Sequence, residues 1–220
     1  MKAIVLFGSP GSGKGTQAKL LTRRLGIPHI STGDMLRERV QRDRELEASV
    51  ASVMHAGALA PDQLVNRMVE ERLGQGDAAK GFVLDGYPRT LAQAEELCHW
   101  LDERGVREVV IYLAVDYNSI IARLTGRRQC PRCGTLYNLV SQPPKVDMQC
   151  DRDGEALVIR DDDSETVIRE RLDAYGRQTR PVLEFLRRAG RRVEEVAAGS
   201  DSPEQVFERI CGIVANHDRA

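Results

Sequence analysis

The sequence predicts an α/β fold with a doubly wound parallel sheet, and three observations support this prediction. Short apolar runs alternate with stretches of helical periodicity along most of the 220 residues, which is the order of a parallel α/β sheet. The runs are mostly continuous, as in strands that helices cover on both faces. A glycine-rich loop joins the first run to the first helical stretch, a typical strand–loop–helix unit.

Four apolar runs are predicted strands, and residues 28–30 are a candidate for a fifth. The four runs are residues 3–7, 82–84, 109–115 and 193–197. Helices are predicted at residues 16–25, 61–73, 91–104 and 118–124. In the second of these helices the apolar residues 64, 65, 68, 69 and 73 fall on one face, as expected for a helix packed on a core.

Composition limits the classes of function. The chain has 32 basic and 33 acidic residues, whereas a sequence-independent nucleic-acid binder needs a basic excess. No run of 18 apolar residues occurs, so no membrane span is predicted. The first strand begins at the N-terminus, where a signal peptide would lie. We therefore expect a cytoplasmic protein, in which clustered cysteines indicate a metal site rather than disulfides.

Two stretches interrupt the strand–helix alternation, and we interpret both as inserted subdomains. One looks helical and lies at roughly residues 31–62, between the first two main strands. The other runs from about residue 128 to 160 and contains Pro143-Pro144 and three cysteines. A structureless loop of that length is uncommon in a compact domain, so this stretch must be functional or held by something.

The glycine-rich loop predicts a phosphate site. Gly8 is followed after four residues by Gly13-Lys14. Backbone N–H groups of such a loop, and the N-terminus of the next helix, surround phosphate oxygens, and the lysine faces the β- and γ-phosphates. Gly15 permits close approach, and Thr16 can reach a phosphate or a magnesium ion. The alternative, a glycine turn that binds nothing, does not explain the lysine in this context.

Acidic and basic residues follow at the expected ligand edge of the sheet. Asp85 and Arg89 come after the strand at residues 82–84, and ligands bind at the carboxyl ends of such strands. An acid there is a usual contact for magnesium-bound water. A single arginine is typically a surface charge, but a set that brackets an insertion favours a phosphate clamp. That set is Arg123, Arg127, Arg128, Arg160 and Arg171. The acids 161–163 are interpreted as a solvated hinge.

The cysteines of the second insertion form two knuckles. Two residues separate Cys130 from Cys133, and two separate Cys150 from Asp153; a glycine follows each pair. This spacing predicts a closed, tetrahedral Cys3Asp zinc site with a structural role. Asp151 is expected to point away. Three incidental cysteines are the alternative.

Further motifs make the chain similar to the adenylate kinase family in its long-lid form. They are residues 30–37, 81–90, 124–128 and 165–172, in this order. The resemblance implies a P-loop nucleoside monophosphate kinase fold, with a central five-stranded parallel sheet, helices on both faces and two inserted subdomains. Its core would be residues 1–30, 61–126 and 165–220, its AMP-binding helical insertion 31–60 and its lid 127–164. It also implies a monomer.

The resemblance implies reversible transfer from MgATP to AMP, giving two ADP and serving adenine nucleotide homeostasis. The implied ATP contacts are Gly11, Ser12, Gly13, Lys14, Gly15, Thr16, Arg123, Arg127, Leu136, Tyr137 and Asp201. The implied AMP contacts are Thr32, Arg37, Ala58, Leu59, Ala60, Gly86, Tyr87, Pro88, Arg89, Gln93, Arg160 and Arg171. The implied catalytic residues are Lys14, Arg89, Arg123, Arg160 and Arg171, and Asp85 would hold Mg²⁺ through water. Tyr87 stands where phenylalanine is usual in the family, and Asp201 where lysine or glutamine is frequent.

Other functions stay open at this point. A kinase for UMP, CMP or GMP is the nearest alternative, although Thr32 and Gln93 favour AMP. A non-catalytic nucleotide sensor does not need Lys14 and the arginines. A nucleic-acid binder that uses the cysteine knuckles disagrees with the balanced charge and the 5% aromatic content.

Overall fold

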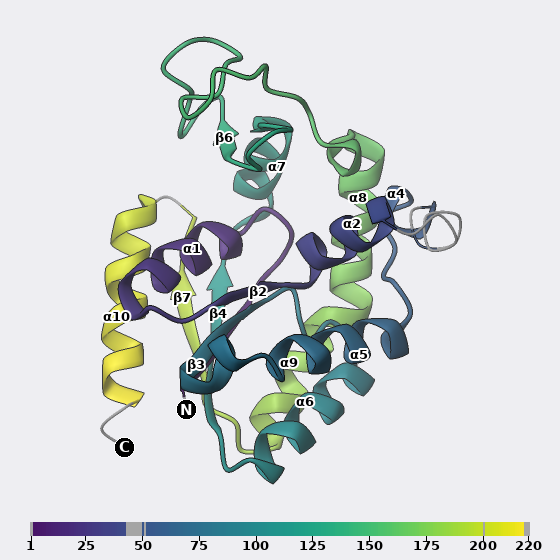
Figure 1. Cartoon of the computed structure of the whole chain (residues 1–220), viewed down its shortest axis with the longest axis vertical. Coiled ribbons are helices and arrows are strands. Elements are labelled where there is room, and N and C mark those ends of the chain that lie inside the picture. Colours follow the sequence, from purple (N-terminus) through teal and green to yellow (C-terminus); the bar gives the residue numbers. More distant parts are fainter. Residues whose placement is uncertain (1, 43–49, 51, 200, 218–220) are drawn as a thin grey trace.

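The computed structural model describes residues 2–42, 50, 52–199 and 201–217. At its centre lies a five-stranded sheet of order β2-β3-β1-β4-β7 (Figure 1). All pairings within it are parallel. The strands are β1 (Lys2–Phe7), β2 (His29–Ser31), β3 (Gly81–Asp85), β4 (Arg107–Ala114) and β7 (Val193–Ala197). The predicted doubly wound sheet is therefore confirmed, including its fifth strand.

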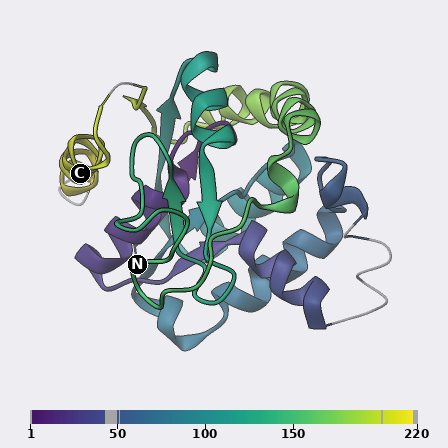
Figure 2. The same cartoon turned by 90° about the horizontal axis from the view of Figure 1, so that it is seen from above.

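Helices cover both faces of the sheet (Figure 2). On one face, alternate β1 residues such as Val5 join an apolar cluster with α5 (Asp62–Leu73), α6 (Leu91–Glu103) and α9 (Arg180–Arg188). On the other face, Ile4 and Leu6 of β1 pack with α1 (Lys14–Leu25) and α10 (Pro203–His217). Period-two alternation in a strand buried on both faces produces these two clusters.

Strand β7 differs from the prediction of a strand covered on both faces. It is an edge strand in which Val196 is buried whereas Glu195 and Ala197 are exposed. The two glutamates of this run, Glu194 and Glu195, already interrupt its apolar pattern, and an edge position keeps their carboxylates hydrated.

The first insertion is described only in part. Helix α2 (Thr32–Arg42) follows β2 directly, and a single helical turn, α4 (Ser52–His55), precedes α5. Residues 43–49 and 51, on which part of the predicted helical insertion falls, lie outside the described residues. A 3₁₀ segment, η2 (Gly76–Lys80), leads into β3.

The second insertion projects from the carboxyl edge of the sheet (Figure 1). It follows α7 (Tyr117–Thr125), contains the antiparallel pair β5 (Arg127–Gln129) and β6 (Leu136–Asn138), and returns through the 3₁₀ turn η3 (Asp161–Asp163). Helix α8 (Glu165–Ala174) and the π-helical segment η4 (Tyr175–Thr179) then lead into α9. We call residues 127–164 the lid segment. In the described part of the chain, no helix combines the length and apolar character that a membrane crossing requires.

Candidate functional site

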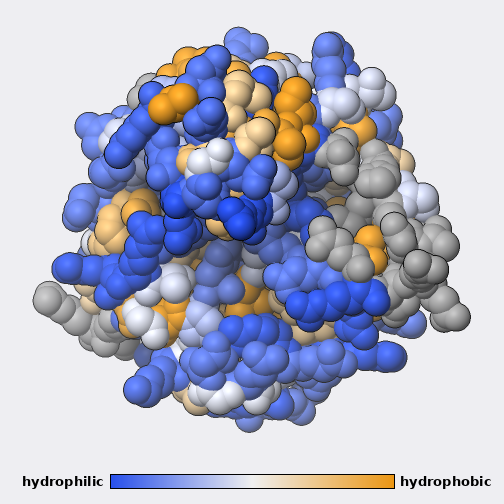
Figure 3. Space-filling model, turned by 45° about the horizontal axis from the view of Figure 1, so that its top comes forward, coloured by the Kyte–Doolittle hydropathy of each residue, from blue (hydrophilic) through white to orange (hydrophobic). Residues whose placement is uncertain are grey.

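A cavity of about 560 Å³ opens at the carboxyl ends of the central strands. Its walls come from the loop after β1, the start of α1, the ends of β3 and α7, and the lid segment. Figure 3 shows the hollow surrounded mostly by hydrophilic side chains. Several predicted ATP contacts from distant parts of the sequence line it, among them Lys14, Arg127, Leu136, Tyr137 and Asp201.

The loop after β1 has the backbone of a phosphate cradle. Gly11 and Gly13 have φ values of 79° and 96°, a region that glycine adopts without the steric cost of a side chain. A Cβ on Gly11 would also lie 2.9 Å from the side chain of Leu124 in α7. Helix α1 begins directly after Gly13, so its positive end faces the cavity. The loop therefore needs glycine for both its turn and its packing.

Lys14 is held inside this loop. Its Nζ donates to the backbone oxygens of Gly8 at 2.7 Å and of Ser9 at 2.9 Å. Loss of hydration lowers the pKa of Lys14 to about 8; Asp85 acts in the opposite direction, and Arg89 and other nearby arginines add to the lowering. A phosphate bound here would place negative charge next to the Lys14 ammonium and would favour its protonated form.

Arg123 connects the phosphate loop to the loop after β7. Its guanidinium donates to the backbone oxygens of Ala198 at 2.7 Å and Gly199 at 2.8 Å, and lies 3.5 Å from that of Ser12. Burial lowers the pKa of Arg123. Asp201, in the same loop, pairs with Arg209 of α10. The sequence did not indicate that pairing, which turns the Asp201 carboxylate toward a cation.

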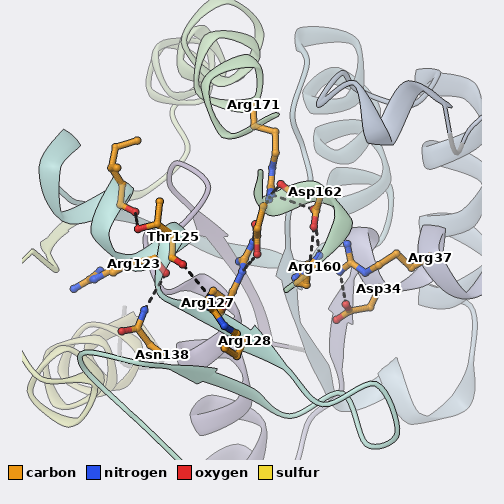
Figure 4. Close-up of polar contacts among 12 residues, drawn as sticks. Asp34, Arg37, Arg123, Thr125, Arg127, Arg128, Asn138, Arg160, Asp162 and Arg171 are labelled. Atoms are coloured by element: carbon orange, nitrogen blue, oxygen red, sulfur yellow. Dashed lines mark hydrogen bonds and ion pairs between the residues drawn. The ribbon is translucent and has the colours of Figure 1, made fainter. Parts of the chain in front are cut away.

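Three of the predicted clamp arginines share two carboxylates (Figure 4). Arg127 donates through Nε to Asp163 at 2.6 Å, and Arg171 lies 3.2 Å from the same carboxylate. Arg160 donates to Asp162 at 3.0 Å, and Arg171 reaches that carboxylate at 3.1 Å. The side chain of Asp163 is 0% exposed. The interpretation of these acids as a solvated hinge is therefore wrong for Asp162 and Asp163, which bind the arginines instead.

Electrostatics in this cluster reflect burial and crowding. Burial lowers the pKa of Arg160 to about 10, and repulsion by Arg37 and Arg127 contributes. For Asp162, burial alone would raise the pKa, but Arg171, Arg160 and other arginines outweigh it and hold the pKa below its usual value. An excess of positive charge thus remains at the mouth of the cavity, as expected for a site that binds anionic groups.

A smaller cavity adjoins the first. It is lined by predicted AMP contacts, namely Thr32, Arg37, Ala58, Leu59, Ala60, Gly86, Arg89, Gln93 and Arg171. Thr32 Oγ1 and Arg89 Nε both donate to the backbone oxygen of Gly86, at 2.8 and 2.7 Å. A Cβ on Gly86 would lie 2.8 Å from the Arg89 guanidinium. Burial lowers the pKa of Arg89 to about 10, with a further contribution from Arg171.

The three other predicted AMP contacts, Tyr87, Pro88 and Arg160, line the larger cavity. The Tyr87 side chain is buried, and its single hydroxyl proton has two acceptors within reach, Asn66 Oδ1 at 3.0 Å and the backbone oxygen of Gln93 at 3.2 Å. Burial raises the pKa of Tyr87 well above its usual range. The Tyr87 hydroxyl thus has polar partners between α5 and α6.

Asp85 lies at the end of β3 against the phosphate loop. A Cβ on Gly15 would be 3.4 Å from its Oδ2, and His29 Nε2 lies 3.2 Å from the same oxygen. No local pattern indicates this role of His29, because it lies 56 residues before Asp85. A carboxylate in this place fits a hard cation such as Mg²⁺.

The lid segment brings the predicted zinc ligands together. One donor atom from each of Cys130, Cys133, Cys150 and Asp153 lies within 4.8 Å of the others. The Sγ atoms of Cys133 and Cys150 are 3.5 Å apart, close to the roughly 3.8 Å edge of a tetrahedron with Zn–S bonds of about 2.3 Å. Three thiols and a carboxylate are donors that suit zinc. Asp151 instead accepts from the backbone N–H of Lys145.

Comparisons with known proteins agree with this geometry. The family model described as adenylate kinase matches residues 6–191. An adenylate kinase of Pseudothermotoga lettingae is 50% identical over 183 residues, which cover 83% of this chain and 84% of that protein. One of Thermodesulfovibrio yellowstonii is 43% identical over 212 residues, 96% and 98% of the two chains. One of Methanocella arvoryzae is 50% identical over 186 residues, 84% and 86% of the two chains. The chain therefore belongs to the adenylate kinase family.

Proposed function

We propose that this chain catalyses reversible transfer of the γ-phosphoryl group of ATP to AMP, giving two ADP. One observation carries the proposal: two adjoining cavities share a border of cationic side chains. Arg37, Arg89 and Arg171 line both cavities, whereas Lys14 and the phosphate loop line only the larger one. Two phosphate-bearing substrates that react with each other need this arrangement, because negative charge concentrates between them.

The proposed roles follow from position and charge. Backbone N–H groups of residues 11–16 and the Lys14 ammonium would bind the phosphates of ATP, with Arg123 and Arg127 at its other side. Arg89, Arg160 and Arg171 would hold the AMP phosphate and the group in transfer. The attacking oxygen of AMP is already anionic, so positioning and charge stabilisation can carry the step without a general base.

Nucleotides would have to displace the internal partners of these arginines. Arg127, Arg160 and Arg171 are now bound by Asp162 and Asp163. These carboxylates keep the guanidinium groups paired and oriented before phosphates arrive. The lid segment that carries Arg127 would close over the substrates and exclude water, which favours transfer over hydrolysis.

Enzymes of this family use Mg²⁺ with ATP. Bound with ATP, the ion would supply positive charge that neutralises the charge developing during transfer. We propose that Asp85 holds it through water, since this carboxylate lies against the phosphate loop at Gly15. Thr16, the first hydroxyl after Lys14, lines the same cavity.

We also propose that the four clustered side chains of the lid segment bind one structural zinc ion per chain. The ion would tie the two knuckles together in a segment that is too small to bury an adequate core. Metal analysis of freshly purified protein tests this, with about one zinc per chain expected from a single tetrahedral site.

A coupled assay with MgATP and each of AMP, UMP, CMP and GMP tests the main proposal. Turnover with AMP should exceed turnover with the other monophosphates. Faster turnover of another monophosphate would reassign the acceptor, and nucleotide binding without any turnover would favour a sensor. A monomeric state and a cytoplasmic location belong to the same proposal, and size-exclusion chromatography with light scattering and cell fractionation test them.

A further inference from the structure

We propose that Asp62 is a positioning residue that determines base selectivity: it fixes the orientation of the Gln93 carboxamide so that the smaller cavity accepts a 6-aminopurine monophosphate and rejects its 6-oxo analogue. The proposal deepens the proposed function and rests on it, since it takes Gln93 as the group that reads the base. Asp62 belongs to the first turn of α5 and Gln93 to that of α6.

Both ends of the Gln93 carboxamide are already bonded. Its Nε2 donates to Asp62 Oδ1 at 2.7 Å, and its Oε1 accepts from the backbone N–H of Arg89 at 2.7 Å. The side chain lines the smaller cavity, and the residue is only 2% exposed. The carboxamide is therefore fixed from both sides at the edge of the cavity.

The chemistry of the two partners allows one orientation only. A carboxylate such as Asp62 accepts hydrogen bonds and cannot donate, whereas the Arg89 N–H donates and cannot accept. Rotating the carboxamide by half a turn would place its oxygen against the carboxylate and its NH₂ against the N–H group. Two favourable contacts would become two repulsive ones inside a buried site, where such contacts are costly.

Asp62 is itself held in place. Its second oxygen, Oδ2, accepts from Thr90 Oγ1 at 2.9 Å. Thr90 is the N-cap of α6, and its oxygen accepts from the backbone N–H of Gln93 at 3.2 Å. The carboxylate, the cap and the carboxamide form one connected network, so Asp62 is not free to turn with Gln93.

The fixed carboxamide suits one kind of purine edge. After these bonds Gln93 retains one N–H to donate on Nε2 and one lone pair on Oε1. Adenine offers a donor at its 6-amino group and an acceptor at N1, which match the two. Hypoxanthine and guanine offer an acceptor at O6 and a donor at N1, which is the reverse pattern. A freely rotating carboxamide would match either edge, whereas this one matches adenine.

A purely structural role for Asp62 predicts a different result. The carboxylate also favours the N-terminus of α5 through the helix dipole and joins α5 to α6 through Thr90. Loss of those effects would lower stability and would slow turnover of both monophosphates alike. The ratio of kcat/KM for AMP to that for IMP separates the two roles, because IMP carries the 6-oxo edge on the same ribose phosphate.

The experiment compares this ratio in the wild-type chain, Asp62→Ala and Asp62→Asn. Asp62→Ala should lower the AMP-to-IMP ratio roughly tenfold or more, the value of a charged hydrogen bond. Asp62→Asn should restore much of it, since the new side-chain oxygen can still accept from Gln93. Asp77→Ala is the matched control: Asp77 is an exposed carboxylate of η2 that pairs with Arg72 at 2.7 Å, and its loss should leave the ratio unchanged.

An unchanged ratio in Asp62→Ala overturns the positioning role while leaving phosphoryl transfer to AMP intact. A wild-type ratio near one, with normal turnover of AMP, overturns it as well. If Asp62→Ala does not fold, NMR of the wild-type chain decides. The side-chain NH₂ signal of Gln93, identified by its loss in Gln93→Glu, should exchange slowly with solvent. Exchange as fast as that of an exposed glutamine overturns the proposal, and this measurement requires no catalysis.

Discussion

The sheet core and the lid segment are stabilised in different ways. In the core, strands β1, β3 and β4 are buried against two apolar clusters that include α1, α5, α6 and α10. The lid segment has two paired strands of three residues each and a cluster of only Cys130, Tyr137, Cys150 and Leu157. Its surface exposes Val140 at 82% and Ile159 at 56%. Apolar burial can hold the core, whereas the lid segment buries few apolar side chains and would depend on the proposed zinc site.

The same contrast applies to charge. Cations at the edge of the core have little exposure to solvent, and burial lowers the pKa of Lys14, Arg89 and Arg171. Asp162 and Asp163, at the end of the lid segment, offset part of this charge. Function is thus concentrated where the two regions meet, and the predictions below separate the contribution of each.

The largest expected effect is on catalysis in the core. Lys14→Ala should reduce kcat roughly 100- to 1,000-fold. This is the usual effect of losing one preorganised donor that stabilises charge in the transition state. The melting temperature should change little, because the apolar clusters are untouched. Lys80→Ala, an exposed lysine of η2, is the control in the coupled assay. Full activity of Lys14→Ala would reject the phosphate-loop mechanism.

The second prediction concerns the stability of the lid segment. Cys150→Ser removes a buried member of the ligand cluster, and we expect loss of zinc and a fall in melting temperature on the order of 10 °C. Binding of a non-hydrolysable ATP analogue should weaken much less. Cys211 is not part of the cluster, so the control variant Cys211→Ser should keep its metal. If the wild-type protein also contains no zinc after purification, the proposed zinc site is wrong.

A smaller effect should appear in the pH dependence of ATP use. The pKa of Lys14 in the free protein is about 8, so kcat/KM for ATP should fall as pH rises through 8 and the ammonium loses its proton. The unfolded chain holds that proton to a higher pH, so this group makes stability rise between about pH 8 and its ordinary value of 10.5. In Lys14→Arg the guanidinium stays charged, and the alkaline fall in kcat/KM should disappear. An identical profile in both proteins would assign the fall to another group.

The smallest effect is predicted for Tyr87→Phe. The change removes hydrogen bonds to Asn66 and to the Gln93 backbone, at an expected cost of about 1 kcal/mol in the free energy of unfolding. The KM for AMP should stay the same, because the hydroxyl faces α5 and α6. Urea denaturation and AMP kinetics check this together. A raised KM at unchanged stability would instead assign the hydroxyl to the substrate.

Much of the fold follows from local patterns in the sequence. The apolar runs at residues 3–7 and 109–115 predicted β1 and β4 to within two residues at either end, since strands covered on both faces need continuous apolar residues. The phosphate loop and the two cysteine knuckles are also short-range motifs. Helix α1 begins at Lys14, two residues before the predicted start, because the turn at Gly13 leads directly into it.

Pairings between residues far apart in the chain become visible only in the folded structure. Arg127 and Asp163 are 36 residues apart, and Asp62 and Gln93 are 31 apart. No periodicity connects such positions; they meet because the sheet brings its loops to one edge. Local patterns alone were enough to predict the strands of the central sheet, helices α1, α5, α6 and α7, the phosphate loop and the four clustered side chains of the lid segment. Which carboxylate holds which arginine, and which way Gln93 faces, depended on burial and on the chemistry of partners that folding brought together.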